Sequence, residues 1–503
     1  MFFEQKDRKT IPRWRDFPST VALGELSNPR ANSPQTITAA QELVAERARE
    51  WRDSPTIWHA ADLLNSALTI GQEGKFKDAA EFILSAKKNA PDGLIALATH
   101  AMGAQKTITP PQKPEDEDQI RRSIHFLRKR LREEPRNSIC SVELARMYVL
   151  IGQYEKAEHA MQIACALDPQ NRYIIRCASR LFVHGGNADV PLSLMRNSPA
   201  TARDPWLLAA EISVSSAMKR PSLFVKRGKQ VLEDASFTDF AKTELTSAVA
   251  TLEMENGSAK RARQMFNASL TAPTENSVAQ AQWASKYLPS IEISEENLSV
   301  PRSFEANALK FSNQGQWELA LEAAQCWLAD QPFSSRPAVM ASYLSSSMLE
   351  RYRQSIEILR RSLIANPRNP ELTNNLAFAM ANDGNVDEAA GILSTIDVAQ
   401  VSGLPTITLS ATKGLVLFRI GLIEIGRSQY QAAIERARGL GAEKYRILAA
   451  LHLAMEEIRA ETDEAQRSTK EALASVPDEA EPDVEVIAAR LRALAEEKHI
   501  QYA

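Results

Sequence analysis

The stretch of sequence that decides the fold is GKFKDAAEFILSAKKNAP, residues 74–91. It has the composition of an ordinary helix, except that the small residues Ala79 and Ala86 lie seven positions apart and Pro91 follows five positions later. Two helices can pack closely only where the side chains between them are small, and a proline ends a helix. The stretch therefore predicts a helix with two close contact points and a defined end.

The same register recurs along the chain, and such recurrence indicates an internal repeat. The further copies are Ala157, Ala164 and Pro169; Ala465, Ala472 and Pro477; Ser355, Ser362 and Pro367; Ala320, Trp327 and Pro332; and, with the proline one position early, Ala262, Ser269 and Pro273. An apolar helical stripe and a glycine precede several copies, as Leu144, Ala145 and Tyr148 precede Gly152. Each unit is thus expected to be a helix, a turn marked by glycine and a second helix.

These units resemble the tetratricopeptide repeat, a helix-turn-helix of about 34 residues with small residues at fixed places. Pro135 to Pro169 spans 34 residues, and Pro332 to Pro367 spans 35. The family's leucine, small residue and tyrosine lie on Leu144, Ala145 and Tyr148, whereas its aromatic position in the second helix holds Ile83 and Met161, and Trp327 and two serines replace small residues. Residues 172–240 match poorly. The resemblance implies an all-α, right-handed α-solenoid of stacked helix-turn-helix hairpins.

Composition shifts along the chain divide it into five expected parts. They are an extended N-terminal arm (residues 1–32), a first solenoid half with degenerate repeats (33–288), a soft linker (289–301), a second solenoid half (302–480), and a polar capping helix with a tail (481–503).

The totals favour helices and set limits on the partners. Of the 503 residues 44% are hydrophobic, 24% are charged and 6% are aromatic, and glycine is sparse; these values are typical of a folded helical protein. The net charge of −3 implies no general attraction to nucleic acid or to an anionic membrane. Residues 404–426 are the most apolar stretch, but Lys413, Arg419 and Glu424 interrupt it, so it is expected to be a buried helix pair.

Catalytic and metal-binding motifs are absent from the sequence. Cys140, Cys165, Cys177 and Cys326 form no CxxC pair and are expected to be reduced thiols, which suits a cytoplasmic protein. No signal peptide is recognisable. The seven histidines are scattered, and acid pairs such as Glu456 and Glu457 are expected on solvated helix faces. We therefore expect no enzyme activity, no cofactor and no metal; an enzyme would require a cluster of perturbed acids or histidines in the fold.

Two basic features are candidate binding sites. In residues 121–136 an apolar stripe leaves five basic residues on the other side: Arg121, Arg122, Arg128, Lys129 and Arg132. Either this is a solvated face or it binds an acidic partner or RNA. In tetratricopeptide arrays the first helices line a concave groove, and by that register Arg172, Arg176 and Arg180, with Arg146 beside them, would bind carboxylates or phosphates there. The alternative, given equal weight, is pairing with Glu143 or Asp168.

The same register places Asn374 and Asn375 where they would bind the backbone of an extended peptide. In the arm, Trp14 and Phe17 would either dock onto a partner or fold back onto the solenoid. The resemblance implies a protein-protein interaction scaffold, adaptor or regulatory subunit that binds an acidic or extended partner segment. Binding to a membrane is not expected. The alternative function is binding of RNA, although the repeats lack a regular pair of base-reading residues.

Overall fold

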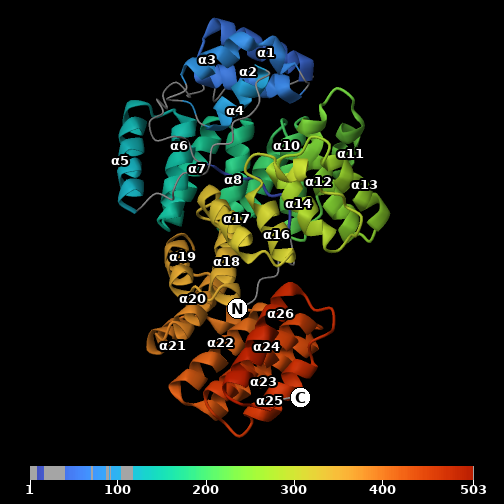
Figure 1. Ribbon diagram of the computed structural model, residues 1–503. Coiled ribbons are helices and arrows are strands. Elements are labelled where there is room, and N and C mark those ends of the chain that lie inside the picture. The colour runs from blue at the N-terminus through green and yellow to red at the C-terminus, as the bar shows by residue number, and fades with distance from the viewer. Residues whose placement is uncertain are drawn as a thin grey trace. The chain divides into compact units, whose positions relative to one another are not determined.

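The computed structural model describes residues 8–15, 40–69, 72–86, 90, 92–102 and 117–501. Regular structure in these ranges is helical, with no residue in a strand. Figure 1 shows successive helices joined by short turns. The described residues thus confirm the expected all-α class.

The chain divides into two compact units, one of residues 5–306 with 329–331 and the other of residues 307–328 with 332–503. The first unit holds α1 (Ala40–Asp53), α2 (Ile57–Thr69), η2 (Glu73–Lys75), α3 (Lys77–Ser85), α4 (Asp92–Ala101), α5 (Glu117–Glu133), α6 (Ser138–Leu150), α7 (Tyr154–Leu167), α8 (Arg172–His184), α9 (Asp189–Asn197), α10 (Pro205–Ala217), α11 (Val225–Glu233), α12 (Asp239–Glu255), α13 (Ala259–Ser269), α14 (Glu275–Ser285) and α15 (Glu295–Leu298). Helices α16 (Phe304–Asn313) and α17 (Trp317–Asp330) include the boundary, and the second unit holds α18 (Ser335–Tyr343), η3 (Leu344–Met348), α19 (Tyr352–Ala365), α20 (Pro370–Asn382), α21 (Val386–Ser394), η4 (Val398–Gln400), α22 (Pro405–Ile420), α23 (Ile423–Gly439), α24 (Glu443–Arg459), α25 (Ala465–Ala474) and α26 (Pro482–Glu497).

Helices within each unit pack in a repeating order. In the first unit α6 packs on α7, α8 on α9 and α12 on α13, while α6, α8, α10 and α12 each also pack on the next even-numbered helix. In the second unit α18, α20, α22 and α24 follow the same rule. The even-numbered helices are therefore the first helices of successive hairpins and form one layer of each stack, as the helical-repeat resemblance implies.

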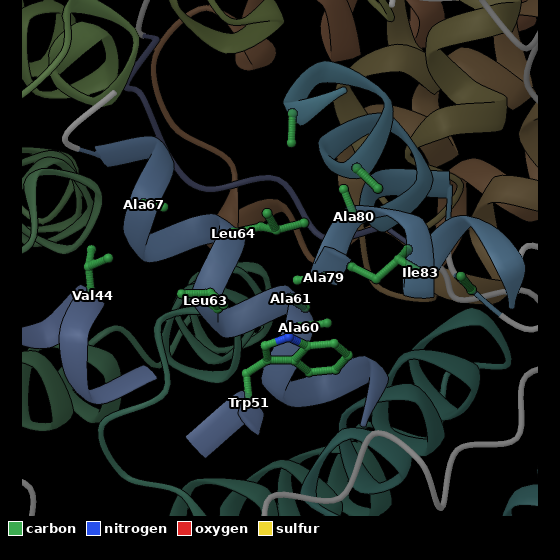
Figure 2. Packing of buried hydrophobic residues seen from close by; sticks show 13 residues of the cluster. Val44, Trp51, Ala60, Ala61, Leu63, Leu64, Ala67, Ala79, Ala80 and Ile83 are labelled. Carbon is green, nitrogen blue, oxygen red and sulfur yellow. The ribbon is translucent and has the colours of Figure 1, made fainter. Parts of the chain in front are cut away.

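The small residues of the repeat register are buried where helices meet. Fully or almost fully buried members are Ala79, Ala157, Ala164, Ala262, Ser269, Ala320, Ser355, Ser362, Ala465 and Ala472. Figure 2 shows Ala79 and Ile83 of α3 in one cluster with Leu64 of α2 and Trp51 of α1. One expected contact point differs, because α3 ends at Ser85 and Ala86 follows it, half-buried.

The apolar stretch 404–426 forms the expected pair of helices, α22 and α23, which pack against each other. The approach is close enough to need glycine. A Cβ atom on Gly414 would lie 2.6 Å from Cδ2 of Tyr430, and one on Gly426 would lie 2.7 Å from Cδ2 of Phe418. Among the described helices none is both long and apolar enough to cross a membrane.

Two segments differ from the simplest reading of their sequence. Residues 289–301, expected as a soft linker, contain α15 and contribute Ile291 and Leu298 to a buried cluster. Glu456 and Glu457, expected on a solvated face, are buried on α24. Neighbouring cations explain this burial, because Arg419 Nε lies 2.7 Å from Glu456 Oε2 and Arg427 Nε lies 2.6 Å from Glu457 Oε1.

The helix expected to cap the chain, α26, packs on α24, α25 and η3. Its first turn accepts a hydrogen bond from the Tyr343 hydroxyl to Asp483 Oδ2, at 2.6 Å. Its Arg490 guanidinium donates to the carbonyls of Ser347 and Met348 in the π-helical turn η3. A π-helical turn disrupts the regular helical hydrogen bonding, and here carbonyls of that turn accept from Arg490.

Candidate peptide-binding surface

Residues 8–15, RKTIPRWR, lie as a segment without helix or strand against the helices of the first unit. Arg8, Thr10 and Trp14 are 2%, 1% and 1% exposed. Pro12 is also buried, whereas Ile11, Arg13 and Arg15 are half-buried. Lys9 is buried as well, and from Thr10 to Arg15 burial alternates from residue to residue, as it does for an extended chain lying on a surface.

Two amide side chains of α14 bind the main chain of this segment. Gln280 Nε2 donates to the carbonyl of Arg8 at 2.7 Å, and Asn276 Nδ2 donates to the carbonyl of Ile11 at 3.1 Å. The two residues lie four positions apart and so share one face of the helix. Contacts of this kind hold any extended chain, because every residue offers a carbonyl.

Arg8 is the most completely bound side chain of the segment. Its Nε and Nη2 donate to the two carboxylate oxygens of Glu305, each at 2.9 Å. Nη1 donates to Gln280 Oε1 at 2.6 Å, and Nη2 donates also to Asn276 Oδ1 at 2.9 Å. A paired, fork-like arrangement of this kind is specific to arginine, since lysine has no planar fork of donors.

The other cations of the segment also face carboxylates. Arg13 Nη2 lies 2.5 Å from Glu305, Arg15 lies 2.7 Å from Glu275 and 2.8 Å from Asp330, and Lys9 pairs with Glu255. Thr10 donates weakly to Ser247 at 3.5 Å. We call the residues that contact the segment the arm-binding surface; they are Ser247, Glu255, Glu275, Asn276, Gln280, Glu305 and Asp330.

The charges of the segment shift the protonation of the surface. Burial alone would raise the pKa of Glu275 and of Asp330, but the positive charges of Arg15 and Arg13 outweigh burial and hold both pKa values below their ordinary range. Asp330 is also 3.3 Å from Arg302. Both carboxylates are consequently ionised at neutral pH and attract the cations of the docked arm.

The arginines predicted to bind a partner lie on α6 and α8, and Arg146, Arg172 and Arg176 lie close to carboxylates of this chain. Arg146 is buried and donates to Glu143 at 2.8 Å, the pairing considered as the alternative from the sequence. Arg172 lies 2.5 Å from Asp204. Arg176 lies 2.9 Å from Glu244 of α12, with its guanidinium 5.2 Å from the Trp206 ring centre. Arg180 is half-buried.

The other predicted site residues are placed as follows. Asn374 and Asn375 lie on α20 and are 3% and 2% exposed. Both amide atoms of Asn374, and the amide nitrogen of Asn375, have no hydrogen-bond partner in the described chain. Trp14 is buried against its own chain, which is the fold-back arrangement, and Phe17 lies outside the described residues.

The residues of the arm-binding surface were not predicted from the sequence to be binding residues. Asn276 and Gln280 had a usable signal, because amide side chains on the first helix of a hairpin are what drew attention to the adjacent pair Asn374 and Asn375. The carboxylates had none, since Glu305 lies 297 residues from Arg8 in the chain. The expected groove chemistry was basic, whereas the surface occupied by the arm is acidic.

The basic face of residues 121–136 is solvent-exposed as expected. Ile120, Ile124 and Leu127 of α5 are buried, while its basic residues on the opposite side are exposed; they are Arg121, Arg122, Arg128, Lys129 and Arg132. No group of three or more His, Cys, Asp or Glu residues in the described ranges is arranged to hold a metal ion.

Comparison with known proteins finds similar solved structures but no matching family model or curated protein. No family model matches the chain, and neither does a curated protein. Similar solved structures include yeast Tom70 (13% identity, 92% of this chain and 96% of that chain covered, TM-score 0.31). The Cut9–Hcn1 hetero-tetramer of the APC/C shares 11% identity, with 90% of this chain and 93% of that chain covered and a TM-score of 0.39. The TPR domain of P58(IPK) shares 13% identity, with 73% of this chain and 100% of that chain covered and a TM-score of 0.22. TM-scores this low assign no function, so the helical-repeat architecture rests on the hairpin packing and the buried small residues described above.

Proposed function

We propose that this chain is a non-catalytic scaffold that binds another protein through an extended segment laid across the first helices of its hairpins. The observation that supports it is the docked arm. Amide side chains of α14 hold the main chain of residues 8–15, and carboxylates hold its cations. A surface that binds an extended chain of its own has the donors and charges needed to bind one from a partner.

The finer proposals concern the site and the cellular role. We propose an adaptor or regulatory subunit in the cytoplasm, and a second contact region on the arginine face of α8, where Arg172, Arg176 and Arg180 would meet an acidic segment. Such a segment would have to compete with Asp204 and Glu244, which now pair with two of these arginines. Asn374 and Asn375 of the second unit, with unpartnered amide atoms, are proposed to bind a partner backbone.

The alternative partner is RNA. The observation that favours it is the row of exposed basic side chains on α5. Binding there would be mainly electrostatic and would weaken steeply as salt is raised.

Gentle purification of the chain from its host, followed by mass spectrometry of what co-purifies, tests the proposal. A stoichiometric protein supports the scaffold function. Loss of that protein when Arg172, Arg176 and Arg180 are changed to Glu would place its contact on the α8 face. Recovery of nucleic acid in place of protein, abolished by charge reversal of Arg128 and Arg132, would support the alternative. Recovery of neither would contradict both.

A further inference from the structure

We propose that the arm-binding surface is the docking site for an extended, arginine-containing segment of a partner protein, and that residues 8–15 occupy it as an internal substitute which the partner displaces. This inference rests on the proposed scaffold function and names the partner chemistry for one surface. It differs from the acidic segment expected on the basis of the sequence, because the surface that holds an extended chain is lined with carboxylates.

The contacts define what the partner segment must offer. The first position is arginine, because the Glu305 carboxylate, Gln280 and Asn276 surround the Arg8 guanidinium with acceptors. Carbonyls at the first and fourth positions meet Gln280 and Asn276. Cations at the sixth and eighth positions meet Glu305, Glu275 and Asp330, and an aromatic ring fills the seventh position, where Trp14 is 1% exposed.

The contacts between residues 8–15 and the arm-binding surface resemble those of a protein-protein interface. The cores of this chain are apolar, as in the cluster of Ala262, Phe266, Val278 and Trp283 beside the surface. The arm combines ion pairs and amide contacts with the packing of Ile11 on an apolar cluster, and Arg8 and Trp14 are its most buried large side chains. Arginine and tryptophan are the residue types enriched at binding interfaces. When the arm leaves, water can hydrate the carboxylates and amides that held it.

Covalent attachment explains how the arm can hold the surface and still be replaceable. A tethered segment acts at an effective concentration on the order of millimolar. A free segment with the same contacts therefore competes poorly with the intact chain, whereas one that makes further contacts elsewhere on the scaffold can displace the arm.

The test converts the tethered arm into a dissociable one without altering any contact residue. A protease recognition site is inserted between Gly24 and Glu25 in the full chain, and the purified protein is cleaved. A fluorescent peptide of residues 8–15 is then titrated into cleaved and uncleaved protein, and anisotropy is measured. We expect at least tenfold tighter apparent binding to the cleaved protein, since the tether is lost. A peptide with citrulline in place of its three arginines, equal in shape but without the three guanidinium charges, should bind at least tenfold more weakly than the arginine peptide.

A variant of the surface provides the second arm of the test. In cleaved protein, Glu305→Gln should weaken the arginine peptide at least tenfold, while Glu117→Gln, which changes an exposed ion pair of α5, should leave its affinity unchanged. The inference is overturned if excess peptide never replaces the arm, or if arginine and citrulline peptides bind equally. A concentration-dependent dimer of the intact chain, lost on Glu305→Gln, would also overturn it, by making the arm of a second copy the occupant.

Failure of this inference can be told apart from failure of the scaffold function. A protein that co-purifies with wild type and equally with Glu305→Gln would retain the scaffold function and exclude this surface as its site. If no protein co-purifies with wild type under any gentle condition, the scaffold function fails whatever the peptides do.

Discussion

At the scale of single residues, Glu305 is the carboxylate on which the docked arm depends most. It accepts hydrogen bonds from both Arg8 and Arg13, and its side chain is 3% exposed. An arginine buried with such a partner is stable, whereas the same arginine without it is left as an uncompensated charge. The ion pair of Arg121 and Glu117 differs, because both side chains are about half exposed and water screens their charges.

Glu305→Gln should therefore undock the arm. Loss of one partner of a buried ion pair costs about 3–5 kcal/mol, which corresponds to a fall of roughly a hundredfold or more in the ratio of docked to undocked arm. Fluorine NMR of protein labelled with 5-fluorotryptophan would report it, with the Trp14 resonance assigned by Trp14→Phe. Glu117→Gln is the matched control and should leave the resonance in place. An unchanged Trp14 resonance in Glu305→Gln would contradict the central role of this carboxylate.

Burial should also separate the four thiols by reactivity. Burial raises the pKa of Cys140 and Cys165 to about 12 and that of Cys177 still further, while Cys326 is half-buried with a pKa that burial raises. At pH 8 a pKa of about 12 leaves roughly a thousandfold less thiolate than the ordinary value. Iodoacetamide should modify Cys326 first and the other three only after unfolding, as mass spectrometry would show. Fast modification that persists in Cys326→Ala would contradict this order.

At the scale of secondary-structure elements, the repeat was predictable because its signals are local. A small residue seven positions from another, a glycine and a proline each act within one hairpin, and their buried positions on α7, α13, α17 and α25 follow from helix geometry. The closeness of α22 and α23 was less evident from sequence. Glycine is a weak helix former, but Gly414 and Gly426 are the points where the two backbones approach. A Cβ atom added to either glycine would lie 3.0 Å from the carbonyl oxygen of the other.

Alanine substitution of Gly414 or Gly426 should lower the free energy of unfolding, whereas the same substitution at the control position Gly391 should raise it. Gly414→Ala and Gly426→Ala should each destabilise the second unit by about 1–3 kcal/mol through overpacking. Gly391→Ala on α21 should stabilise it by about 0.5–1 kcal/mol, because an added Cβ there meets nothing within 4 Å and alanine favours the helix. Urea unfolding followed by circular dichroism would compare the midpoints. Equal shifts for Gly414→Ala and Gly391→Ala would show that the close approach is not a tight contact.

At the scale of the whole molecule, the prediction from sequence fell short where contacts join distant parts of the chain. The sequence predicted a non-helical arm with Trp14 and Phe17 as its notable residues, but nothing local pairs residues 8–15 with carboxylates some 300 positions away. The same limit applied to Arg176, whose partner Glu244 lies 68 residues further on. Helical periodicity shows which residues share a face of one helix; it does not show which faces the stacking of hairpins brings together.

Docking of the arm should respond to pH, because it depends on carboxylates. Glu275 and Asp330 have pKa values lowered in the docked state from the ordinary 4.5 and 3.8, since the attraction of Arg15 and Arg13 outweighs the effect of burial. A group whose pKa is lowered in the docked state stabilises that state above its ordinary pKa, and this contribution is lost as the pH falls.

The Trp14 resonance should therefore show loss of the docked arm as the pH is lowered from about 5 to about 3, before the helical circular dichroism of the whole chain declines. Arg15→Gln supplies the control, because it removes the main charge that lowers both pKa values and should flatten the pH dependence of docking. If docking in Arg15→Gln fell with pH as steeply as in wild type, the carboxylates facing Arg15 would not be the groups that titrate. If wild-type docking were unchanged down to pH 3, ion pairing would not be what holds the arm, and the apolar contacts of Trp14 and Ile11 would have to hold it instead.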